Sequence, residues 1–189
     1  YVEGKDGWHR HPFTIASAPQ EATVRVTVKA LGDFTSAITT VIEPGMPAVL
    51  GEAHGHFDHH RGTNTQVWLA AGVGVTPFLS WLRAAAPGEL APSVDFFYTV
   101  AGPAPFADEL AALAARHPGV RLHVVDSTVT GRLTAQAVLA ATREATHADP
   151  RDLSVFLCGP APMLATFETE LRAAGVPRRR IHREYFDLR

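Results

Sequence analysis

The stretch Leu69-Ala-Ala-Gly72-Val-Gly74-Val-Thr76-Pro77 decides the fold. An apolar run leads into two glycines and then a threonine and a proline, which is the pattern of a buried strand, a tight turn and a helix start. We expect Thr76 to cap that helix and Pro77 to be its first residue. Glycines let backbone N–H groups approach a pyrophosphate, and a helix N-terminus favours negative charge. The stretch therefore predicts a dinucleotide site, although Pro77 replaces the third glycine of the usual motif and a plain strand–helix turn has a similar pattern.

Downstream of this stretch, apolar strands alternate with amphipathic helices. This alternation predicts a doubly wound parallel five-stranded sheet of strand order 3-2-1-4-5, with helices on both faces. The fourth strand ends at Phe156-Leu-Cys158-Gly159-Pro160, so its turn should share a crevice with Gly72 and Gly74; a buried structural cysteine is the alternative interpretation. Strands are expected at 67–71, 94–100, 120–125, 154–158 and 181–186, and helices near 77–86, 104–117, 134–145 and 161–174.

The first third of the chain has a different pattern, typical of antiparallel β-structure. Residues 13–17 are short and apolar, and 22–30 alternates valines with polar residues, so Val24, Val26 and Val28 are expected to point inward. A short helix capped by Asp33 and a strand at 46–50 should follow. The loop from Gly51 to Asn64 is the candidate boundary, which predicts domains at 1–62 and 63–189.

Composition excludes several classes of function. The chain has 189 residues, 46% of them hydrophobic, and a net charge of −2, so it has material for a core but no basic excess for nucleic acid. A single cysteine excludes a disulfide framework or a cysteine-held iron–sulfur cluster within the chain. No G-x-S-x-G elbow surrounds Ser80, which disfavours a hydrolase. Because the first residue is Tyr1, we expect the chain to be a piece of a larger protein.

A third motif brings a family resemblance. His11-Pro12-Phe13-Thr14-Ile15-Ala16-Ser17, the two glycine turns and the terminal Glu184-Tyr185-Phe186 resemble, in order and spacing, the ferredoxin–NADP reductase superfamily. The chain is most similar to the cytosolic dehydrogenase part of bacterial ferric-reductase-like transmembrane proteins and NADPH oxidases. The resemblance implies FAD and NADPH or NADH as cofactors. It also implies that residues 1–62 form a partial antiparallel FAD-binding barrel, N-terminally incomplete, which we expect to retain FAD weakly.

The resemblance implies roles for residues around the flavin. His11 and Pro12 lie where the family contacts the FAD pyrophosphate, and imidazole should hold it less firmly than arginine would. Phe13 would pack on the flavin ring, and Thr14 would place a hydroxyl near flavin N5. The remaining implied contacts are backbone amides along the diphosphate at Ile15, Ala16 and Ser17, and a second flavin loop at Gly51 and Gly55.

On the nicotinamide side, the resemblance implies that the first glycine turn, including Thr76 and Pro77, binds the NAD(P)H pyrophosphate. Cys158, followed by Gly159 and Pro160, would lie beside nicotinamide C4, and Phe186 would cover the flavin until nicotinamide replaces it. Thr14, Cys158 and Phe186 are thus the implied catalytic residues. Separately, Arg132 could reach a nucleotide phosphate or be an ordinary surface arginine at a helix start.

Two further features are open to more than one interpretation. The loop with His54, His56, His59 and His60 is interpreted as a flavin loop, so no metal is predicted; a metal site and a solvated loop are the alternatives. Arg178-Arg179-Arg180 is interpreted as a solvated turn, with a membrane surface or a partner domain as the alternative contact.

The expected function is electron transfer from NAD(P)H through FAD to a one-electron acceptor. The resemblance implies haem of an attached transmembrane domain as that acceptor, with ferric iron or oxygen beyond it, and a location on the cytoplasmic side of the inner membrane. A soluble reductase serving an oxygenase or ferredoxin is the alternative enzyme. A regulatory module that binds both cofactors without turnover is the alternative from another class.

Overall fold

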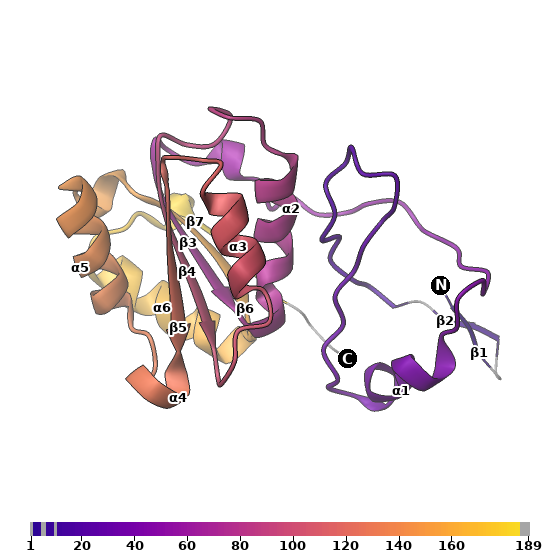
Figure 1. The fold of residues 1–189 in the computed structure, drawn as a ribbon. Coiled ribbons are helices and arrows are strands. Elements are labelled where there is room, and N and C mark those ends of the chain that lie inside the picture. The colour runs from indigo at the N-terminus through magenta and orange to yellow at the C-terminus, as the bar shows by residue number, and fades with distance from the viewer. Residues whose placement is uncertain (1, 5–6, 10, 186–189) are drawn as a thin grey trace.

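The computed structural model describes residues 2–4, 7–9 and 11–185, which form an α/β part and an N-terminal part (Figure 1). The α/β part contains one five-stranded parallel sheet of spatial order β5-β4-β3-β6-β7. In order of the strands along the chain this is 3-2-1-4-5, which confirms the predicted topology. The strands are β3 (Thr65–Ala71), β4 (Ser93–Val100), β5 (Val120–Asp126), β6 (Ser154–Gly159) and β7 (Ile181–Tyr185).

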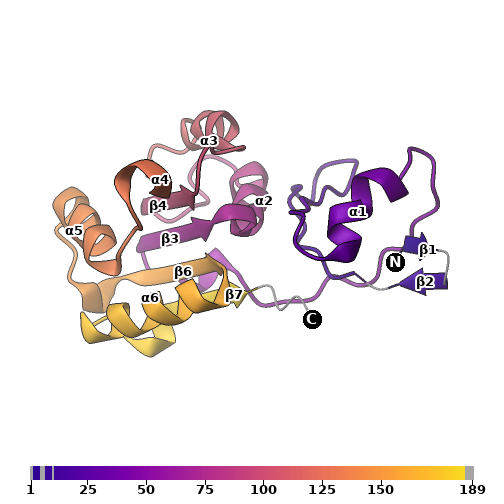
Figure 2. The ribbon, with the colours of Figure 1, turned by 90° about the horizontal axis from the view of Figure 1, so that it is seen from below.

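Helices cover both faces of this sheet, because successive residues of the buried strands point to opposite sides. Trp68 and Ala70 of β3 pack with α2 and α3, whereas Val67 and Leu69 pack with α5 and α6. Figure 2 shows the two helix pairs on either side of the strands. The helices are α2 (Thr76–Ala84), α3 (Ala107–Ala114), α5 (Ala135–Thr146) and α6 (Ala161–Ala173), together with the one-turn α4 (Ser127–Thr130).

The described residues of the N-terminal part have little regular structure. They form a short antiparallel pair, β1 (Val2–Gly4) with β2 (Gly7–His9), and the helix α1 (Asp33–Val41). The predicted helix is present, but Gly32 rather than Asp33 is its N-cap. Among the described helices, none has both the length and the apolar character needed to span a membrane.

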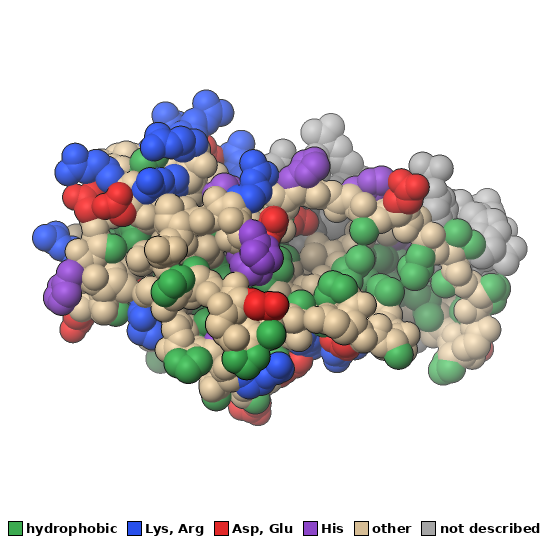
Figure 3. All heavy atoms as spheres, turned by 90° about the horizontal axis from the view of Figure 1, so that it is seen from above, with side chains coloured by type: hydrophobic (Ala, Val, Ile, Leu, Met, Phe, Trp, Pro, Cys, Tyr) green, Lys and Arg blue, Asp and Glu red, His purple; other side chains and the backbone are tan. Residues whose placement is uncertain are grey.

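The individual strands predicted at 13–17, 22–30 and 46–50 are wrong. The first two meet only at the antiparallel bridge between Ile15 and Val26, and no strand covers 46–50. Val24 and Val26, expected to point inward, are 52% and 45% exposed. A strand needs a neighbouring backbone and an apolar surface to cover, and these segments have little of either. Figure 3 shows apolar side chains that gather on this part of the molecule. The exposed large apolar residues of this part include Leu31, Ile42, Val49 and Leu50.

Candidate functional site

The carboxyl ends of β3 and β6 meet at the centre of the sheet, and their glycine turns lie against each other. A Cβ on Gly74 would lie 2.3 Å from the backbone oxygen of Cys158 and 2.9 Å from the nitrogen of Gly159. A Cβ on Gly159 would lie 2.8 Å from the Cβ of Ala71. The two turns therefore lie together at the switch point, as the strand order predicts, and the small size of these glycines is what permits it.

The first turn differs in detail from the sequence-based expectation. A 3₁₀ turn, Gly72–Val75, separates β3 from α2, so Thr76 is the first residue of the helix and Pro77 the second. The N-cap is Val75, not Thr76, and the Thr76 hydroxyl donates back to the carbonyl of Val73 at 3.0 Å. Gly72 has a φ of +54°, a conformation that glycine adopts at little cost.

A cavity of about 60 Å³ joins the N-terminal part to this turn. Pro12, Phe13 and Thr14 line one side of it, and Val73 and Thr76 line the other. The Thr14 hydroxyl has no hydrogen-bond partner among the described residues. The surface of the cavity is mostly apolar, and an aromatic ring and a free hydroxyl contribute to its lining. The remaining lining residues are Thr27, Val28, Lys29, Leu31 and Thr35.

Two other residues predicted to bind the flavin make contacts within the protein instead. The His11 ring stacks on Phe34 of α1, with centroids 3.5 Å apart. Of the three backbone amides expected along a diphosphate, that of Ala16 donates instead to the carbonyl of Arg25 at 2.8 Å. In this conformation, Ala16 therefore offers no amide to a ligand.

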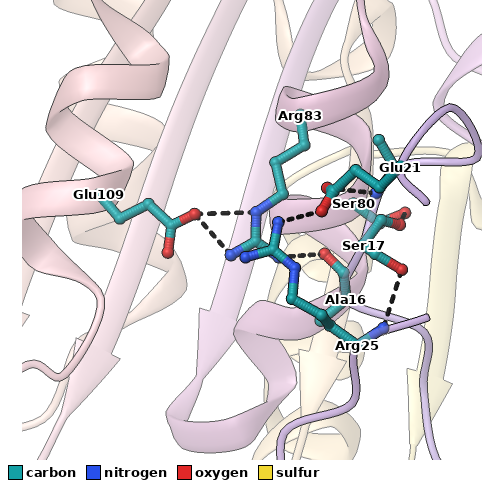
Figure 4. Close-up of polar contacts among 8 residues, drawn as sticks. Ala16, Ser17, Glu21, Arg25, Ser80, Arg83 and Glu109 are labelled. Carbon is teal, nitrogen blue, oxygen red and sulfur yellow. Dashed lines mark hydrogen bonds and ion pairs between the residues drawn. The ribbon is translucent and has the colours of Figure 1, made fainter. Parts of the chain in front are cut away.

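Helix α2 holds the N-terminal part through one face, on which Ser80 and Arg83 make the contacts (Figure 4). On the same face, the backbone oxygen of Ala84 accepts a hydrogen bond from the Gln20 side chain. The Ser80 hydroxyl donates to the carbonyl of Ser17 at 2.8 Å, and an Arg83 Nη donates to the carbonyl of Ala16. Arg83 also pairs with Glu109 of α3, its Nε 2.8 Å from a carboxylate oxygen. Because the Arg83 side chain is only 9% exposed, its ion pair is partly shielded from water. The sequence indicated no role for Arg83 or Glu109.

The Cys158 thiol is fully buried among the side chains that β3 and β6 direct toward α2. Burial, and then the charge of Glu184, raise the pKa of this thiol, so it is protonated at neutral pH. Cys158 is the register partner of Glu184 on β7, and burial also raises the pKa of that carboxyl. Phe186, the predicted cover of the flavin, lies outside the described residues.

Three predicted residues lie apart from the cavity. Gly51 and Gly55 belong to an exposed loop and do not line the cavity, and Arg132 is exposed in the segment before α5.

Two features outside the cavity were not expected. Where the loop that contains Gly51 and Gly55 ends, burial and the neighbouring His60 lower the pKa of His59 to about 4. No sequence signal marked Asp126, which ends β5 and accepts a hydrogen bond from the amide of Gly102 just after β4.

The doubly wound sheet, with glycine turns at its switch point and an N-terminal part docked on α2, defines a two-part dinucleotide-binding oxidoreductase. Comparison with known families agrees with this class. Residues 68–169 match the oxidoreductase NAD-binding domain, and residues 4–71 match an FAD-binding domain. The first match covers more than half of the chain, so the chain belongs to the oxidoreductase NAD-binding domain family. Its cofactors are FAD and a nicotinamide dinucleotide.

Relatives share both parts of the chain. It is 30% identical over 98% of its length to an NADPH oxidoreductase of Mycobacterium tuberculosis, of which it covers 49%. It is 31% identical over 93% of its length to the ferredoxin reductase component of 3-ketosteroid-9-alpha-monooxygenase of Rhodococcus rhodochrous, of which it covers 50%. The chain therefore spans about half the length of these relatives.

The fold also matches a solved structure. A ferredoxin NADP⁺ reductase from Neisseria gonorrhoeae with bound FAD and NADP aligns with a TM-score of 0.75 at 20% sequence identity. The alignment covers 98% of this chain and 82% of that one. The resemblance to ferredoxin–NADP reductases inferred from the motifs is thus confirmed at the level of fold.

Proposed function

We propose that this chain passes electrons from NAD(P)H to FAD and then, one at a time, to an acceptor. The observation that carries the proposal is the cavity shared by Pro12, Phe13 and Thr14 with Val73 and Thr76. In it, the residues that we assign to the flavin lie next to the turn that we assign to the nicotinamide nucleotide. The corresponding domains are 1–62 for FAD and 63–189 for NAD(P)H.

The main contribution of the protein to this reaction is to align the two cofactors. Bound FAD accepts two electrons as hydride and returns them singly. Phe13 would offer an aromatic face, and Thr14 a hydroxyl at the polar edge of the ring. Cys158 is a neutral thiol buried behind the first glycine turn and does not line the cavity. It would therefore add no charge near the transfer path and would contact the donor only after neighbouring side chains move. Gly72, Gly74 and the start of α2 would hold the donor's pyrophosphate, so that the reacting atoms approach to about 3–3.5 Å.

The acceptor we propose is haem in an attached transmembrane domain, with ferric iron or oxygen beyond it. The motif His11-Pro12-Phe13-Thr14 supports this proposal. A match to dual oxidase 1 of Rattus norvegicus, 33% identical over 39% of this chain and 5% of that protein, favours oxygen as the final acceptor. In that arrangement the chain would lie on the cytoplasmic side of the inner membrane. The second candidate is a soluble reductase for an oxygenase, which the match to the monooxygenase's ferredoxin reductase component favours.

Steady-state turnover of the FAD-loaded chain tests this function with ferricyanide as the one-electron acceptor. We expect reduction with NADPH, NADH or both. Thr14→Val should lower kcat by about tenfold while the KM for the donor changes little, because one hydrogen bond near the transfer path is lost. Thr27→Val, in the same cavity but without an assigned role, is the matched control. Tight FAD binding without turnover with either donor would instead identify a regulatory module.

A further inference from the structure

A cluster of metal-ligand side chains lies outside the cofactor cavity, at the one-turn 3₁₀ helix His59–Arg61. Asp58, His59 and His60 each offer one ligand atom, and these atoms all lie within 4.8 Å of one another. Asp58 is the N-cap of the turn and accepts the His60 amide at 3.0 Å. Its carboxylate also lies 2.7 Å from His60 Nδ1. A tight backbone turn therefore holds the three side chains together.

His59 is the buried member of this cluster, and it lines a cavity. His59 is only 6% exposed, and its ring packs against His60, Trp68 and Trp81. Among the described residues this ring has no hydrogen-bond partner. His59 is not among the described side chains whose nitrogens are both sealed from solvent and unpartnered, and it lines a cavity. Its imidazole can therefore accept a ligand from that cavity.

The space beside His59 has room for a ligand. A cavity of about 180 Å³ is lined by Asp58, His59 and His60, and the carboxylate residue Glu89 lines it as well. Its other walls are Pro19, Ser80, Trp81, Ala84 and Ala85. It shares no lining residue with the cavity assigned to the flavin. An ion here would therefore occupy a separate site.

We propose that Asp58, His59 and His60 bind a divalent transition-metal ion of the zinc type. Two imidazoles and a carboxylate are a ligand set that suits Zn²⁺. In a tetrahedral site with bonds near 2.0–2.1 Å, ligand atoms lie about 3.3 Å apart, so rotations of the exposed side chains would close the set. The cavity leaves the fourth position to water or to Glu89. The bound ion would be coordinated by an imidazole nitrogen of His59 and would hold this loop against α2.

The test is calorimetric titration of the whole chain with ZnCl₂ after removal of any histidine tag. We expect saturable binding of one ion per chain, and Co²⁺ should give the visible absorption of a low-symmetry imidazole site. His60→Ala and Asp58→Asn should each weaken Zn²⁺ binding by about tenfold or more. Both changed side chains are at least half exposed, so the fold should persist, as circular dichroism can verify. Asparagine is also a good N-cap, so the second substitution should leave the turn in place.

The matched control is the double variant His54→Ala/His56→Ala. It removes two exposed histidines of the same loop but none of the proposed ligands, and should bind Zn²⁺ like the parent chain. Three results would overturn the proposal. They are a dissociation constant weaker than about 1 mM, unchanged binding in both ligand variants, and loss of binding in the control.

Discussion

Gly74→Ala is expected to abolish NAD(P)H binding and to destabilise the fold. The new methyl group would lie 2.3 Å from the backbone oxygen and 2.6 Å from the backbone carbon of Cys158. Backbone atoms in a buried parallel sheet cannot rotate away, so the two glycine turns must separate. Overpacking of this kind costs about 3 kcal/mol. Denaturant unfolding and titration with NADP⁺ measure the two effects.

Gly72→Ala is the control for this prediction. No heavy atom outside its chain neighbours lies within 4 Å of the added Cβ, so only the positive φ opposes the substitution. The expected loss of stability is about 1 kcal/mol. If the two variants lose stability and nucleotide affinity equally, the close contact between the turns is not what requires Gly74.

Arg83→Gln is expected to slow hydride transfer to FAD by about tenfold or more, with little change in the donor's dissociation constant. The substitution removes the forked contact to Glu109 and the donor to the Ala16 carbonyl. Residues 11–17 would then be less firmly placed against the turn that precedes α2. Stopped-flow reduction at several donor concentrations separates the transfer rate from donor affinity.

Glu109→Gln is the comparison variant for Arg83→Gln. It keeps an acceptor for the guanidinium and leaves the contact to Ala16 in place, so the transfer rate should fall less than in Arg83→Gln. An unfolding curve for each variant separates positioning from stability. An unchanged transfer rate in Arg83→Gln would show that this contact does not align the two parts.

The α/β part was predictable because its signals are local. Apolar runs and proline–glycine stops marked every strand and the four longer helices of this part. The connection rules for doubly wound sheets then predicted the order of the strands. The start of α2 was misplaced by one residue because Gly72–Val75 forms a 3₁₀ turn, so Val75 takes the capping position. The one-turn α4 was missed because four residues carry no helical period.

The N-terminal part was harder because its structure depends on contacts distant in sequence. The alternating valines at 22–30 are typical of a strand, but pairing decides whether one forms, and only one bridge does. No sequence pattern distinguished Arg83, because its contact with Ala16 joins residues 67 apart. The histidines at 59 and 60 were visible in the sequence, whereas the burial of only the first was not.

Anaerobic mixing of the FAD-loaded chain with NADPH, and separately with NADH, measures hydride transfer between the two cofactors. We propose a direct transfer, within one chain that holds both. Direct transfer predicts loss of the oxidised-flavin absorbance with at least one donor, and a slower loss when the transferred hydrogen of that donor is deuterium. Unchanged absorbance with both donors, in protein shown to bind FAD and the nucleotide, would contradict it.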